Sequence, residues 1–144
     1  MNLKELLDKG KIEKVEKGEM NFEKVEGDLA VAENNFEDGS YEWALSICYH
    51  AVLRASMDLM SSLGYRAKGS EHHKNVFLFL GNFEELEDFV KYFDRIRRKR
   101  NDFLYRGSDV ISKDESSEAI KMAKELISKI RTFVSKIRTG GLYG

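Results

Sequence analysis

The chain has 144 residues, of which 42% are hydrophobic and 34% charged, and its formal net charge is -1. These values predict one globular domain with a real core and a heavily charged surface, and they exclude a disordered chain. They also exclude a general electrostatic attraction to nucleic acid, so any contact with phosphate has to come from a local basic patch.

Proline is absent and most glycines lie between periodic segments, which favours an all-α fold. The single cysteine, Cys48, excludes an internal disulfide framework and a cysteine-based zinc site. The first residues lack the apolar core of a signal peptide, and no later stretch approaches the length of a membrane span. We therefore expect a cytoplasmic protein without membrane contact, and we expect no cofactor.

The first 18 residues predict a short helix followed by a loosely attached strand or loop. From Phe22 to Phe36, apolar residues recur at steps of three and four, which predicts the first long helix, and Gly39 is placed to end it. The next helix spans residues 41–63 and is apolar on most sides, so we expect it at the buried centre of the fold. Its polar residues nearly all fall on one row with four-residue spacing, which consists of Glu42, Ser46, His50, Arg54 and Asp58.

Two interpretations of this polar row stay open. His50 can reach Arg54 one turn away, and Arg54 can reach Asp58, so the row is typical of a ladder of surface pairs. The row can also line a cleft.

Cys48 lies in the same helix and is expected to be a small core residue rather than a nucleophile, because no cation is placed to lower the pKa of its thiol.

A shorter helix is expected from Glu71 to Leu80, with Ser70 as its cap. Its adjacent His72 and His73 point about 100° apart on a helix, so they cannot easily chelate one metal ion. With no cysteine nearby, we expect no metal site in this chain.

Asn82 and Glu85 have the spacing of an N-cap and a third-position acid, which predicts that the next helix begins here. This helix is expected to run to about Tyr105 and to be closed by Gly107. The segment Ser112-Lys113-Asp114-Glu115 is a capping box, and it predicts the start of a long final helix.

The densest run of positive charge lies at residues 94–107. At about 100° per residue, Arg100 projects near the middle of the apolar face of its helix, and Arg97, Asn101 and Tyr105 form a row along the shoulder of that face. A buried guanidinium is costly without acceptors, so Arg100 implies a partner carboxylate, a bound phosphate or a gap through which it reaches water. The rest of the run is typical of a solvated face whose cations complement the helix dipole.

Five segments of the chain form a recognisable series. They are Tyr41-Glu42-Trp43-Ala44, Cys48-Tyr49-His50-Ala51 with Arg54-Ala55, Gly64-Tyr65-Arg66, Glu71-His72-His73-Lys74, and Arg97-Arg98-Lys99-Arg100-Asn101-Asp102-Phe103-Leu104-Tyr105. In this order and spacing, they resemble the HEPN domain (higher eukaryotes and prokaryotes nucleotide-binding) in its small stand-alone prokaryotic branch. The resemblance covers about residues 20 to 137.

The resemblance implies an up-and-down bundle of about five helices at residues 20–138, after an amino-terminal segment at 1–19 and before a flexible tail at 139–144. It also implies a homodimer in which paired helices bring two arginine motifs to one cleft. Many members of the family are metal-independent ribonucleases. They are often toxins encoded beside a minimal nucleotidyltransferase that acts as the antitoxin.

The family motif is an arginine, a polar residue, three further residues and a histidine. Arg100 and Asn101 match its first two positions, but position 105 is Tyr105. Tyrosine has a pKa near 10 and is a poor base, whereas histidine, near 6.5, suits proton transfer at neutral pH. By this resemblance, Arg100 clamps a phosphate, Asn101 orients a phosphate or 2′-hydroxyl, and Tyr105 stacks on a base or donates to phosphate.

Further candidate binding residues are Arg97, His50 and Arg54, and one of the three histidines could supply the missing proton carrier. Three functions stay open. The chain binds RNA or a nucleotide and partners a nucleotidyltransferase; or it is an active ribonuclease toxin; or it is a structural module in which Arg100 only satisfies a buried acid such as Asp58 or Asp94. Binding is expected to survive the tyrosine at position 105 better than cleavage.

Overall fold

The computed structural model describes the backbone of residues 1–106 and 111–138, and the side chains of these residues apart from 100–106 and 138. The predicted tail at 139–144 and the predicted end of a helix at Gly107 lie outside the described residues. In chain order, the elements are α1 (Leu3–Asp8), β1 (Ile12–Lys14), α2 (Phe22–Glu37), α3 (Tyr41–Ser62), β2 (Tyr65–Ala67), α4 (His72–Leu80), a 3-10 turn (Glu84–Leu86), α5 (Glu87–Arg106) and α6 (Lys113–Arg138).

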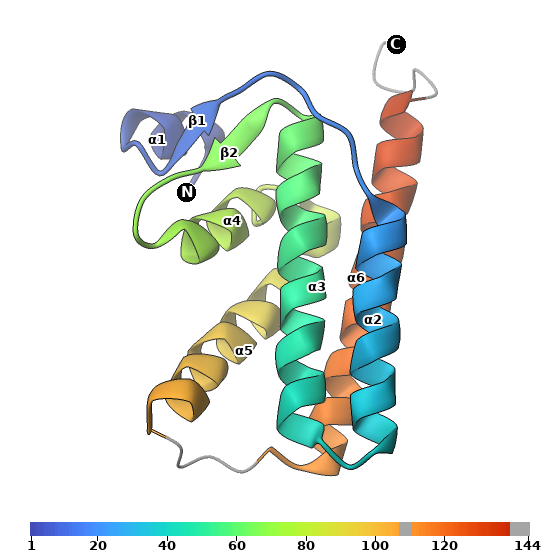
Figure 1. The fold of residues 1–144 in the computed structure, drawn as a ribbon. Coiled ribbons are helices and arrows are strands. Elements are labelled where there is room, and N and C mark those ends of the chain that lie inside the picture. The colour runs from blue at the N-terminus through green and yellow to red at the C-terminus, as the bar shows by residue number, and fades with distance from the viewer. Residues whose placement is uncertain (107–110, 139–144) are drawn as a thin grey trace.

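The predicted all-α fold is confirmed, with one small two-stranded sheet in addition. Helices α2, α3 and α6 pack along one another as the centre of the bundle, and α5 runs diagonally beside α3 (Figure 1). The short α4 lies across the bundle, above α5 in this view. Within the described residues, none of the helices is long and apolar enough to cross a membrane.

Local hydrogen bonds set most helix boundaries where the sequence predicts them. At the start of α2, the side chain of Asn21 accepts a hydrogen bond of 3.1 Å from the backbone N–H of Lys24. At the start of α6, Ser112 Oγ accepts one of 3.1 Å from the N–H of Glu115, as the predicted capping box requires. Gly39 has a φ of 82°, a left-handed conformation that glycine adopts easily, and it separates α2 from α3.

The prediction that Asn82 opens a helix is wrong. Its side-chain amide donates to the carbonyl oxygens of Leu78 and Phe79, at 3.3 and 3.1 Å, and so satisfies the carboxyl end of α4. The chain then makes the 3-10 turn before α5 begins at Glu87. Ser70 is not the cap of α4 either, because that position is occupied by Glu71.

Helix α3 is the buried centre of the bundle on its inward face. Ala44, Cys48, Ala55 and Leu59 are all fully buried there. Cys48 is buried, so the prediction of a small core cysteine is confirmed, and burial raises the pKa of its thiol to about 12. The outward face of α3 differs from the expectation of a helix buried on most sides, because the apolar side chain of Trp43 is 54% exposed.

The amino-terminal segment is not loosely attached. Strand β1 pairs antiparallel with β2, with Ile12 opposite Ala67, and the side chain of Ile12 is buried in the core together with that of Leu6. Beyond β1, the N–H of Gly18 donates to the carbonyl oxygen of Ser61 at 3.0 Å. Backbone hydrogen bonds and two buried apolar side chains therefore fix the segment over the carboxyl end of α3.

Candidate functional site

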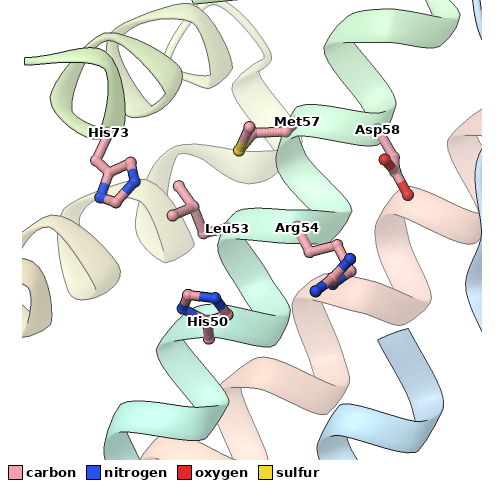
Figure 2. Close-up of a pocket in the computed structure, with 6 residues that line it drawn as sticks. All are labelled: His50, Leu53, Arg54, Met57, Asp58 and His73. Carbon is pink, nitrogen blue, oxygen red and sulfur yellow. The ribbon is translucent and has the colours of Figure 1, made fainter. Parts of the chain in front are cut away.

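A groove lies between α3 and α4, with a cavity volume of about 310 Å³. We call it the α3–α4 groove. Its lining residues are His50, Leu53, Arg54, Met57, Asp58 and His73. Figure 2 shows Leu53 and Met57 on the side of α3 that faces His73 of α4, with Arg54 and Asp58 on the side toward α2. Three members of the predicted polar row line this groove, so the structure supports the cleft rather than a ladder of surface pairs.

Arg54 is held by a helix other than its own. Its Nε lies 3.1 Å from Oδ2 of Asp28 on α2, and both side chains are about one third exposed. The ion pair fixes the stem of Arg54 along the wall of the groove. Because a guanidinium carries five N–H donors, the rest of its fork can still bind an anion.

Asp58 has a different environment. One of its carboxylate oxygens accepts a hydrogen bond of 3.3 Å from the backbone N–H of Asn21. Partial burial raises the pKa of this carboxyl, and the Asn21 hydrogen bond opposes the rise. Asp58 thus joins the start of α2 to α3 at the edge of the groove, and its negative charge lies beside the positive charge of Arg54.

Two histidines from different helices face the same space. His50 is exposed on α3, and His73 is half-buried on α4, where its ring lies 4.3 Å from that of His72 and 6.4 Å from that of Tyr49. The sequence shows both histidines, but only the packing of α4 on α3 brings them into one groove. A neutral imidazole offers one donor and one acceptor, so the pair can take and return protons.

Helix α5, which carries the predicted motif, packs against both helices that form the groove. In the described part of α5, Arg97 Nε lies 3.0 Å from Oδ1 of Asp94, and the Arg97 side chain is largely buried. Arg97 is not among the described residues that line the groove. Asp94, suggested as the acid that Arg100 satisfies, therefore already has a cationic partner, whereas Asp58 accepts the backbone N–H of Asn21.

Arg100, Asn101 and Tyr105 lie on α5, but their side chains fall outside the described residues. Their predicted roles stay predictions.

Just before Arg100, Lys99 pairs with Glu115 in the first turn of α6 and holds the pKa of that carboxyl below its usual value. Arg95 and Arg98 are exposed, and the Arg95 guanidinium lies 5.2 Å from the centre of the Tyr92 ring, so this stretch of α5 presents cationic surface beside a fixed ion pair.

Among the described residues, no three histidine, cysteine or acidic side chains gather in a way that could hold a metal ion. The groove itself offers two imidazoles, one guanidinium and one carboxylate. This combination is suited to holding a phosphate and to exchanging protons with it.

Comparison with known proteins decides the family. The family model of the HEPN domain matches residues 19–133, which is most of the chain. The chain belongs to the HEPN family. HEPN domains commonly dimerise and bind RNA, so this is a module of the RNA-binding or ribonuclease-like kind. Neither the curated proteins nor the solved structures gave a significant match to this HEPN chain.

Proposed function

We propose that this HEPN chain binds RNA or a nucleotide through the α3–α4 groove and the Arg-Asn motif of α5. The observation that carries the proposal is the groove itself, which joins Arg54, His50 and His73 on two helices that both pack against α5. In this proposal the chain is a homodimer with a degenerate catalytic motif, and it partners a minimal nucleotidyltransferase as one half of a toxin–antitoxin pair.

The chemistry of the groove favours a phosphate. Arg54 is anchored through Nε, which leaves its terminal N–H groups to donate to phosphate oxygens. The imidazoles of His50 and His73 can donate to the same phosphate or stack on a base. Arg100 adds a second cation from α5, Asn101 orients the 2′-hydroxyl or phosphate, and Tyr105 donates or stacks.

Binding is the first function proposed because Tyr105 stands where the family motif has histidine. A phenol with a pKa near 10 remains protonated at neutral pH, so it can donate a hydrogen bond but cannot accept the 2′-hydroxyl proton efficiently. Replacing the histidine therefore leaves the phosphate-holding groups in place and removes the usual proton carrier.

The test is a salt titration of RNA affinity. Fluorescence anisotropy with a labelled single-stranded RNA should show that Arg100→Ala and Arg54→Ala weaken binding and that each reduces the slope of log affinity against log salt by roughly 0.7, the value for one lost phosphate contact. Lys121→Ala, an exposed residue on α6, is the matched control for net charge and should leave both quantities unchanged. Unchanged affinity and slope in Arg100→Ala would reject the motif as a phosphate site.

The partnership with a nucleotidyltransferase is tested separately in cells. If the neighbouring reading frame encodes such an enzyme, expression of the HEPN chain alone should slow growth, and co-expression should restore it. Growth that is unaffected by the HEPN chain in the absence of that enzyme would argue against a toxin.

The two histidines of the groove favour a second candidate, an active metal-independent ribonuclease. One imidazole would remove the proton of the 2′-hydroxyl as its oxygen attacks phosphorus. The other would give a proton to the leaving 5′-oxygen, which yields a 2′,3′-cyclic phosphate and a 5′-hydroxyl. His50 and His73 would thus do together what the histidine of the family motif does elsewhere.

Cleavage is measured with structured and single-stranded RNA in the presence of a chelator. Products ending in cyclic phosphate, lost in both His50→Ala and His73→Ala but kept in His72→Ala, would establish this ribonuclease. Intact RNA at every pH between 6 and 9 with the wild-type chain would reject it and leave binding.

A further inference from the structure

The connection between β1 and α2 crosses the carboxyl-terminal turns of α3 (Figure 1). We call residues 15–21 of this connection the strap. Backbone N–H groups at every third residue of the strap donate to the last turns of α3 or to the residue that follows them. The bonds run from Val15 to the carbonyl oxygen of Gly64 at 2.9 Å, from Gly18 to that of Ser61 at 3.0 Å, and from Asn21 to the carboxylate of Asp58 at 3.3 Å. The strap therefore has a fixed course along α3.

A cavity of about 320 Å³ lies between the strap, the end of α3 and β2, and we call it the strap pocket. Its volume is in the range of small-molecule sites. Met57 and Asp58 line both the strap pocket and the α3–α4 groove, so the two cavities adjoin at these residues. The full set of residues that line the strap pocket is Val15, Met57, Asp58, Met60, Ser61, Tyr65, Arg66 and Ala67.

The walls of the strap pocket are held from two sides. On one side, the strap lies close to α3 because position 18 is glycine, since a Cβ on Gly18 would collide with the hydroxyl oxygen of Ser61. On the other side, Tyr65 belongs to the strand β2 that pairs with β1, and its ring centroid lies 5.6 Å from that of Phe79. A pocket that is formed in advance loses little free energy in ordering when it binds a ligand.

Asp58 is the acidic residue among the described residues that line the strap pocket. The cation of Arg66, at the rim, already pairs with Glu13 of β1. The N–H of Asn21 takes one acceptor position of the Asp58 carboxylate, and a carboxylate offers about four such positions. The pocket therefore presents a carboxylate that can accept further hydrogen bonds, and the Ser61 hydroxyl lies one turn along α3.

A carboxylate is satisfied best by two adjacent hydrogen-bond donors. Among the four RNA bases, guanine presents such a pair on its Watson–Crick edge, the N1–H and the 2-amino group, with the acceptor O6 beside them. Adenine and cytosine place an acceptor nitrogen next to their amino group, and the single N–H of uracil lies between two carbonyl oxygens. These three bases would each turn a lone pair toward a carboxylate.

We propose that the strap pocket binds a guanine base of RNA. The Asp58 carboxylate accepts from N1–H and the 2-amino group, the Ser61 hydroxyl donates to O6, and the ring lies against Met57 and Tyr65. This inference deepens the proposed function and rests on it for the phosphate. Arg54 lies one turn before Asp58, about 6 Å along α3, so a nucleotide whose phosphate contacts Arg54 reaches the strap pocket with its base.

The surroundings of Asp58 suit this role. Partial burial raises the pKa of its carboxyl, because the charged form has lost part of its hydration. Two donors from a base would replace the lost water. Hydrogen bonds to a charged group are stronger than those between neutral groups, so the loss of one donor from the base should weaken binding by about tenfold or more.

Competition in fluorescence anisotropy measures the base preference of the full chain. Short oligouridine RNAs with one central guanosine, inosine, adenosine or uridine displace a labelled RNA. The guanosine RNA should bind at least about tenfold more tightly than the inosine RNA, which lacks only the 2-amino group. Equal affinities for the guanosine and inosine RNAs would overturn the proposal.

Asp58→Asn gives a second readout. The asparagine oxygen can still accept from N1–H, but its amide N–H group now meets the 2-amino group of guanine. The variant should therefore lose the preference for guanosine and gain one for xanthosine, whose 2-oxo group accepts from the amide. A residue that only holds Asn21 would not reverse a base preference. A variant that prefers guanosine to xanthosine as strongly as the wild type does would contradict the proposed contact.

Asp114→Asn is the matched control, because it makes the same change at an exposed position of α6 outside the strap pocket. It should keep the guanosine preference of the wild type. The far-ultraviolet circular dichroism spectra of both variants should equal that of the wild type, which shows that the fold is retained.

Base preference and salt dependence separate this inference from the proposed function. Equal affinities for the guanosine and inosine RNAs, together with a reduced salt slope in Arg54→Ala, would overturn the guanine site and leave phosphate binding in place. A guanosine preference that persists while Arg54→Ala and Arg100→Ala leave the salt slope unchanged would support the guanine site and reject the phosphate site. A wild-type chain that binds none of these RNAs would overturn both.

Discussion

The inward face of α3 presents small or tightly packed residues such as Ala44, Ala55 and Leu59, all fully buried, whereas its outward face leaves Trp43 and Met57 about half exposed. The inward face of this helix is buried in the core, whereas the apolar side chains of its outward face stay partly exposed. The inward face holds the monomer together. Trp43 and Met57 bury a smaller share of their apolar surface within the chain than the residues of the inward face do.

The largest loss of stability is expected from a substitution on the inward face. Leu59→Ala removes a fully buried side chain and leaves a cavity, so it should lower the free energy of unfolding by about 2–5 kcal/mol. Met57→Ala, two residues away on the outward face, should change it by less than about 0.5 kcal/mol. Urea denaturation at low protein concentration measures both. Equal losses of unfolding free energy in the two variants would show that Met57 stabilises the fold as much as Leu59 does.

Overpacking provides the second contrast. Ala55→Leu inserts three carbon atoms into a fully packed site, so it should cost about 1–3 kcal/mol. Ala30→Leu makes the same change on an exposed position of α2 and should be close to neutral. Thermal denaturation of the two variants measures the difference in their stability. A destabilised Ala30→Leu chain would contradict the description of Ala30 as an exposed residue.

The third prediction concerns the edge of the groove. Because burial raises the pKa of Asp58, the folded state favours its protonated form. That contribution to stability is fully present below the unfolded pKa and is lost as pH rises through the folded pKa. Asp58→Asn removes the charge and keeps an acceptor for Asn21, so it should raise the midpoint temperature at pH 7 by a few degrees at most and leave it unchanged at pH 3. A lowered midpoint at pH 7 would mean that the charge of Asp58 stabilises the fold.

The smallest change in stability is expected at the ion pair between Lys99 of α5 and Glu115 of α6. The Lys99 ammonium holds the pKa of Glu115 below its usual value, so this pair stabilises the fold above the unfolded pKa and the effect is lost as pH falls through the folded pKa. Both side chains are more than a third exposed, and solvent screening limits the effect of Glu115→Gln to about 0.2–1 kcal/mol at pH 7. Urea denaturation should show a smaller effect at pH 3 than at pH 7, and a smaller effect in high salt than in low salt. A loss at pH 3 as large as that at pH 7 would point to the cap with Ser112 instead.

Periodicity was sufficient to predict the long helices and the all-α fold, because the apolar stripes of α2, α3 and α6 are set by local sequence. It could not predict which apolar residues stay exposed. Trp43 and Met57 contribute to the apolar character of α3, but their exposure depends on how α2, α4 and α5 pack against α3. Asn82 was misassigned for a related reason, since it closes α4 and does not open α5.

The site was predictable only in part. Spacing within one helix suggested that Arg54 could pair with His50 or Asp58, but its partner is Asp28, which is 26 residues away in sequence. His73 was visible as a residue, and its place opposite α3 depends on how α4 packs. Contacts between helices carry no local periodic signal, so the sequence indicated the residues of the groove without indicating their arrangement.

The pairing of β1 with β2 has a consequence for how the chain is made. Residues 12–14 find their hydrogen-bonding partners only at residues 65–67, more than fifty positions later. During translation, this strand cannot complete its backbone hydrogen bonds until α2, α3 and β2 have all left the ribosome. Closing so long a loop is slow compared with forming a helix, so the sheet is expected to form late in biosynthesis, after the α2–α3 hairpin is already in place.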